Sequence, residues 1–99
     1  MAQMTFSAFE IEALARGFDE VLERKWAPHA VQGSHTHPFA VDALVVQGEM
    51  WLTVDDVVRQ LGPDDAFALD ANVVHSERYG AEGAVLWAAR RNASGTAAQ

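Results

Sequence analysis

The first stretch of the chain has the apolar spacing of a helix. Four of its apolar residues fall on one helical face, namely Phe6, Phe9, Ala13 and Leu14. Gly17 stands where a helix ends in a left-handed residue. We therefore predict a short amphipathic helical segment over residues 5–17.

From Phe18 onward, apolar and polar residues alternate with period two or the apolar residues form short runs. Both patterns are typical of β-strands. Strands are predicted at residues 20–26, 33–37, 40–47, 49–54, 57–61, 66–69, 74–79 and 84–89. Residues that favour turns separate these segments, and short strands at about 8–12-residue spacing favour an antiparallel sandwich or barrel over a parallel α/β fold.

The length of the chain fits one folding unit. A chain of 99 residues buries about 60–68% of its unfolded surface, which is enough for one compact core and too little for two. Because no internal repeat or linker divides it, residues 1–99 are predicted to form a single domain. The stretch 92–99 is small and polar, and we expect it to be disordered.

Charge and hydropathy argue against two classes of partner. The net charge of −7 repels a phosphate backbone, so we expect no nucleic-acid partner. No apolar stretch approaches the roughly 18–20 residues of a membrane span, and the N-terminus lacks the pattern of a signal peptide. We therefore expect no membrane partner and a cytoplasmic location.

Three histidines are the strongest candidates for chemistry. His35 and His37 are two residues apart on an extended segment, so their side chains point to the same side of a sheet, about 6–7 Å apart. His75, in a later strand, supplies a third imidazole. Because the chain has no cysteine, a metal ion has to be held by His, Asp, Glu or water. Our hypothesis is that these three imidazoles share one metal ion.

These residues resemble the two motifs of the small single-domain cupins. The first motif is, in outline, Gly, five residues, His-x-His, three or four residues, Glu, six residues, Gly, and it is matched by His35, His37 and Gly48. The second is Gly, five residues, Pro-x-Gly, two residues, His, three residues, Asn, and His75 matches its histidine. The resemblance covers residues 33–79. It implies an all-β fold, an antiparallel cupin barrel of the double-stranded β-helix or jelly-roll type, preceded by the helical segment.

The match is incomplete at the position of a fourth metal ligand. Counting back from Gly48 places the motif's Glu at Val41, whereas counting forward from the histidines of the first motif places it at Asp42. If Val41 faces inward along its strand, Asp42 faces outward. His29, in a turn before the first motif, is another candidate ligand. Tyr79 stands where the second motif has its Asn.

The donor atoms indicate the chemistry of the site. Three neutral imidazoles suit a divalent transition metal, namely Zn, Ni, Fe, Mn or Cu, with positions left open for water or a small ligand. Glu77 has the parity of His75 on its strand, so it is predicted to face the site as a general base or hydrogen-bond acceptor, or to pair with an inward arginine. Phe39 and Phe67 flank the histidine segments and are predicted to form a pocket wall.

Two classes of function fit this chain. The resemblance to metal-dependent cupins implies an oxygenase or isomerase that acts on a small organic molecule. The resemblance to stand-alone or regulator-attached cupins implies a protein that binds or senses a small ligand without metal or turnover. In both cases we expect a homodimer, since pairing hides the edge strands of a small barrel, with residues 50–52 and the Phe6/Phe9 face as contact surfaces.

Overall fold

Two long strands form the framework of the fold. β3 (Phe39–Val54) and β6 (His75–Asn92) are 16 and 18 residues long and pair antiparallel along most of their lengths. The computed structural model describes residues 4–92. The other elements are α1 (Phe6–Ala15), β1 (Glu20–Trp26), β2 (Val31–His35), β4 (Val57–Leu61) and β5 (Ala66–Leu69).

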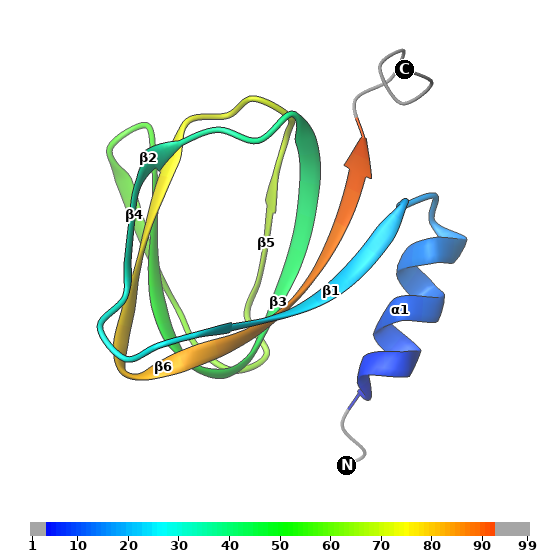
Figure 1. Cartoon of the computed structure of the whole chain (residues 1–99), viewed down its shortest axis with the longest axis horizontal. Helices are drawn as coiled ribbons and strands as arrows, with labels where there is room; N and C mark the ends of the chain where they lie inside the picture. The colour runs from blue at the N-terminus through cyan, green and yellow to red at the C-terminus, as the bar shows by residue number, and fades with distance from the viewer. Residues whose placement is uncertain (1–3, 93–99) are drawn as a thin grey trace.

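The four shorter strands extend this pair into two layers. β2 pairs with the first part of β6 and β4 with the last part of β3, which gives the order β2-β6-β3-β4. β1 pairs with the last part of β6 and β5 with the first part of β3, which gives β1-β6-β3-β5. Each of these pairings is antiparallel, and the sheet curves into a barrel (Figure 1). The all-β antiparallel barrel predicted from the strand pattern is therefore confirmed.

Gly48 and Gly83 allow β3 and β6 to bend from one layer into the other. The register of the β3–β6 ladder shifts between Val45 and Gln47 and again between Gly48 and Met50. The φ angles of Gly48 and Gly83 are 83° and 71°. A Cβ atom on Gly48 would lie 2.1 Å from the carbonyl oxygen of Gly83, so only glycine permits this close approach. Two pairs of predicted strands are in fact continuous, 40–47 with 49–54 and 74–79 with 84–89.

Alternate residues of the strands fill the interior of the barrel. The buried apolar residues of this core are Val41, Ala43, Val45, Met50, Leu52, Leu61, Phe67, Leu69, Tyr79, Ala84, Leu86 and Ala88. On β3 the inward positions are odd before Gly48 and even after it, which is the effect of a register shift on a strand whose side chains alternate. The strands predicted at 20–26, 57–61 and 66–69 have the observed bounds.

The helix α1 packs on the outside of the barrel. Thr5 caps its first turn, because Thr5 Oγ1 accepts a hydrogen bond from the backbone N–H of Ala8 at 3.1 Å. Phe9 is buried in a second apolar cluster that includes Trp87 of β6. The ring of Phe6 meets that of Trp87 edge-on, with centroids 5.7 Å apart. The Phe6/Phe9 face therefore packs in part against the chain itself, with Phe9 buried and Phe6 half-buried, and its role as a contact surface stays a prediction.

The second predicted contact surface, residues 50–52, is mostly internal. Met50 and Leu52 are buried inside the barrel. Trp51 faces outward, and the guanidinium carbon of Arg78 lies 4.1 Å from the centroid of its ring. Only Trp51 of this segment is thus placed to contact a second copy, and the homodimer stays a prediction.

The last strand reaches farther than the sequence predicted. Asn92 was expected to begin a disordered tail, but it pairs with Phe39 at the end of β6, and its backbone N–H donates a hydrogen bond to Asp19 Oδ2 at 2.7 Å. The rest of that predicted tail, 93–99, lies outside the described residues. Between residues 4 and 92, α1 is too short to cross a membrane.

Candidate metal centre

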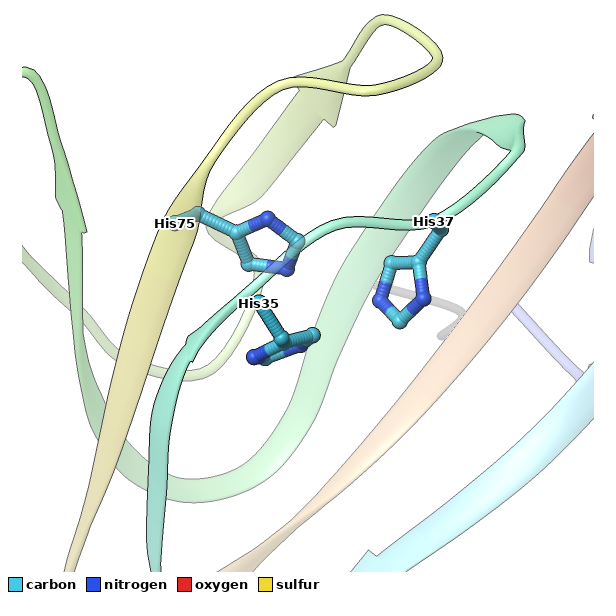
Figure 2. A group of neighbouring side chains, drawn as sticks. All are labelled: His35, His37 and His75. Carbon is cyan, nitrogen blue, oxygen red and sulfur yellow. The ribbon is translucent and has the colours of Figure 1, made fainter.

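Three histidine rings point toward one another from two neighbouring segments (Figure 2). His35 is the last residue of β2 and His75 the first of β6, and the two are opposite each other in the β2–β6 ladder. His37 follows in the connection to β3. The ring centroids are 4.3 Å apart for His35 and His75, 4.8 Å for His35 and His37, and 5.1 Å for His37 and His75. One ring nitrogen of each lies within 4.8 Å of the other two, so the structure brings together all three predicted ligands.

Backbone carbonyl groups orient two of these imidazoles. His75 Nδ1 lies 3.0 Å from the carbonyl oxygen of Val73, and His35 Nδ1 lies 2.6 Å from that of Gly33. Because a carbonyl oxygen only accepts hydrogen bonds, each Nδ1 carries the proton and donates it, which leaves a lone pair on Nε2. The Nε2 atom of His75 is buried and has no hydrogen-bond partner among the described residues. Such an orphaned lone pair is what a metal ligand presents.

The surroundings of His37 favour its neutral form. Burial lowers the pKa of His37 below its usual value of 6.5, and charge on His75 or His35 would lower it further. Its ring also stacks on Phe39, with centroids 4.9 Å apart and planes 11° apart. The neutral imidazole is the form that binds a metal, so these contacts prepare His37 for that role.

Glu77 faces the three histidines, as the alternation along its strand predicted. Its Oε2 atom lies 3.3 Å from His75 Nε2 and 4.0 Å from His35 Nε2, and its side chain is 11% exposed. Its Oε1 atom accepts a hydrogen bond from the hydroxyl of Tyr79. In the part of the chain that the structure describes, ring nitrogens of these histidines lie within 4.0 Å of the Glu77 carboxylate, and no arginine pairs with it. Its catalytic role stays a prediction.

Tyr79 supports Glu77, and sequence reasoning missed this. The side chain is buried and stacks on Trp26, with ring centroids 4.9 Å apart and planes 12° apart. Burial raises the pKa of Tyr79, and the hydrogen bond to Glu77 raises it further, so the phenol stays protonated and continues to donate. The available signal was parity, because residues 75, 77 and 79 alternate along one face of the strand.

A cavity of about 180 Å³ adjoins the histidines and brings two guanidinium groups to them. Arg24 on β1 lines it, with the guanidinium carbon 5.2 Å from the centroid of Trp26. Arg90 on β6 also lines it, lies 4.6 Å from the centroid of Phe39, and pairs with Glu20 Oε1 at 3.2 Å. The chain is acidic overall, yet two of its seven lysines and arginines border this cavity.

Of the other predicted site residues, some lie beside the histidines or their cavity and some lie elsewhere in the barrel. Phe39 lines the cavity, whereas Phe67 lies in the barrel core and borders a different pocket, of about 600 Å³, beside α1. Val41 faces the interior, and Asp42 does not belong to the histidine cluster, since its Oδ2 atom pairs with Arg16 of the α1 segment at 3.2 Å. His29 is exposed in a turn at φ 60° and is likewise outside the cluster.

The donor set fits a divalent transition metal. Two imidazoles present free Nε2 lone pairs, the third is kept neutral by burial, and a carboxylate lies beside them. Imidazole and carboxylate donors suit Zn, Ni, Fe, Mn and Cu, and the affinity order of these ions gives little selectivity. The residues present therefore suit metal binding and leave the identity of the ion open.

Solved structures resemble this barrel. An RmlC-like cupin from Shewanella frigidimarina is 24% identical, with a TM-score of 0.66, over 77% of this chain and 68% of that one. A chain from the DMSP lyases RdDddP and RnDddQII is 21% identical, with a TM-score of 0.69, over 77% and 40% of the two chains. An HTH_3 family transcriptional regulator from Vibrio cholerae is 18% identical, with a TM-score of 0.63, over 75% and 43%. At these identities the likeness shows the fold alone.

Comparison with curated proteins finds no match. The model of the cupin domain matches residues 22–88, which is more than half of the 99 residues. This range includes β2 to β5, most of β1 and β6, and all three clustered histidines. The chain belongs to the cupin family.

Proposed function

We propose that this cupin binds one divalent transition metal through His35, His37 and His75. The observation that carries the proposal is the buried Nε2 atom of His75, which has a free lone pair and no hydrogen-bond partner among residues 4–92. Leaving a buried polar atom unpaired costs about 1–3 kcal/mol, and a bound cation would remove that cost. The same backbone restraint on His35 supports the proposal, because it directs a second Nε2 toward the same point.

The bound ion would serve a small ligand in the adjoining cavity. A volume of about 180 Å³ equals roughly six liquid water molecules at about 30 Å³ each, so the ligand is small. Arg24 and Arg90 favour an anionic group on it, such as a carboxylate. When bound, the metal supplies a Lewis acid to the ligand or to water. Metal-dependent oxygenases and isomerases of small organic acids are the activities that this arrangement suits best.

A second candidate is a ligand-binding or sensor cupin without metal and without turnover. The observation that favours it is Val41, an apolar residue where the first cupin motif has a glutamate ligand. Arg24 and Arg90 would then hold the ligand, and the histidines would hydrogen-bond to it. The fold does not decide between these candidates, since the cupin barrel supports many functions.

Metal analysis separates the two candidates. The protein, purified without a histidine tag, should contain close to one equivalent of a transition metal by elemental analysis, and His37→Ala should remove most of it. His29→Ala is the matched control, because His29 is exposed and outside the cluster, and this variant should keep the metal. Metal-free wild-type protein that takes up no added ion, with an unfolding temperature that a chelator leaves unchanged, would favour the metal-free candidate.

A further inference from the structure

The proposed metal centre lacks the carboxylate that the first cupin motif provides. By its two possible spacings, the motif would place a glutamate at Val41 or at the next residue. Val41 has no donor atom, and Asp42 pairs with Arg16 instead of joining the histidines. β3 therefore brings no carboxylate to the three imidazoles.

We propose that Glu77 of β6 is the fourth protein ligand of this centre, an assignment that rests on the proposed metal site. Ligand bonds of about 2.0–2.2 Å, separated by angles of about 90–110°, place neighbouring donor atoms about 2.8–3.6 Å apart. Glu77 Oε2 lies 3.3 Å from His75 Nε2, within that range. Its Oε2 atom lies 4.0 Å from His35 Nε2 and outside the group of three ring nitrogens that lie within 4.8 Å of one another, so the Glu77 side chain has to move toward His35 and His37 to coordinate the same ion.

The polarity of these atoms also indicates a cation between them. Because Nδ1 of His75 and Nδ1 of His35 donate to backbone carbonyls, the Nε2 atoms that face Glu77 are hydrogen-bond acceptors. The Oε2 atom of an ionised carboxylate is also an acceptor. Acceptors that face one another at 3.3 Å in a buried space repel, and no hydrogen bond joins His75 Nε2 to Glu77. A divalent ion turns this repulsion into coordination.

Tyr79 positions the carboxylate for this role. Its hydroxyl holds Glu77 Oε1 and leaves Oε2 directed at the histidines. The stacking of Tyr79 on Trp26 fixes the phenol in turn. Metal-bound carboxylates characteristically carry such an outer hydrogen bond, which fixes their orientation. Tyr79 is thus a positioning residue, and Glu77 gives the centre three nitrogen donors and one oxygen donor.

The experiment compares metal affinity and ligand geometry. Metal-free wild type, Glu77→Gln, Tyr79→Phe and the control Glu82→Gln, an exposed acid on the same strand, would each be titrated with Co²⁺ and Zn²⁺. Loss of an outer hydrogen-bond partner weakens metal binding about 10–100-fold. We expect Glu77→Gln to weaken it at least 100-fold and to alter the visible spectrum of Co²⁺, which reports the donor set. Tyr79→Phe should weaken it about 10-fold with a similar spectrum, and Glu82→Gln should bind like wild type.

The outcomes distinguish this inference from the proposed function. Wild type that binds neither ion overturns both. If wild type binds and Glu77→Gln keeps the wild-type spectrum, with affinity unchanged or reduced less than 100-fold, Glu77 is not a ligand and the three-histidine site stands alone. Circular dichroism checks that the variants fold. If Glu77→Gln does not fold, Glu77→Asp, which retracts the carboxylate by one methylene, should show weaker binding and an altered spectrum, and wild-type behaviour of that variant overturns the inference.

Discussion

The indole of Trp26 lies nearly parallel to the phenol of Tyr79, with ring centroids 4.9 Å apart and an angle of 12° between the planes. Trp26 ends β1 and Tyr79 lies in β6, so this stack joins two strands that are far apart in the sequence. The guanidinium of Arg24 also lies over Trp26, and the hydroxyl of Tyr79 donates a hydrogen bond to Glu77. The orientation of the Glu77 carboxylate therefore depends on an aromatic residue of another strand.

Trp26→Ala should reduce both stability and metal affinity. It removes a large side chain and an aromatic pair worth about 0.5–1.5 kcal/mol beyond its buried area, so we expect the free energy of unfolding to fall by about 2–4 kcal/mol. Urea unfolding in the presence of a chelator measures this loss. Trp51→Ala, on the outer surface beneath Arg78, is the control and should cost about 1 kcal/mol or less. Equal losses for the two variants would contradict the structural role of the stack.

His37 should make the metal-free protein less stable in acid. Because burial lowers its folded pKa below 6.5, the unfolded chain takes up this proton first as the pH falls. The stabilisation that neutral His37 gives to the folded state is therefore complete above pH 6.5. It is lost as the pH falls from 6.5 through the lower pKa of His37 in the folded protein. Unfolding measured against pH with chelator present should show a smaller acid loss for His37→Gln than for wild type. Parallel curves for the two proteins would contradict this expectation.

Arg24 and Arg90, the two arginines that line the cavity, should make it prefer an anionic ligand. Hydrogen bonds to charged groups contribute about 1.5–3 kcal/mol, so Arg24→Gln or Arg90→Gln should weaken the binding of a small carboxylate such as succinate by about 10-fold or more. Calorimetry on the metal-loaded protein measures this. Arg59→Gln is the control, because Arg59 is exposed and does not line this cavity. Unchanged succinate affinity in both cavity variants would indicate a neutral ligand.

The pattern of apolar residues predicted most of the fold because the strands alternate strongly. β1, β4 and β5 have their predicted bounds, because turn residues bound the segments 20–26, 57–61 and 66–69. The strand pattern predicts breaks at residue 48 and over residues 80–83, but Gly48 and Gly83 each lie inside a continuous strand. Glycine is favoured both in a turn between two strands and at a bend inside one strand. Only the pairing with a neighbouring strand distinguishes these two cases.

The candidate site was predictable where it depends on spacing along one strand. His35 and His37 follow from a two-residue step, and the orientation of Glu77 follows from its parity with His75. The cross-strand partners were not predictable in the same way. Arg90 and Trp26 reach the site because β1 pairs with the last part of β6, a register that the local sequence does not contain.

Gly48→Ala in β3 should destabilise the barrel more than Gly62→Ala in the β4–β5 turn. The new Cβ would lie 2.1 Å from the carbonyl oxygen of Gly83, and φ of 83° strains any residue with a Cβ. We expect the free energy of unfolding to fall by at least about 2 kcal/mol, measured by urea unfolding. Gly62→Ala, where a Cβ meets nothing within 4 Å, is the control and should change stability by less than about 1 kcal/mol. Similar stabilities for the two variants would mean that β3 and β6 do not approach at this point, and the continuous strands that hold His75 opposite His35 would then need another explanation.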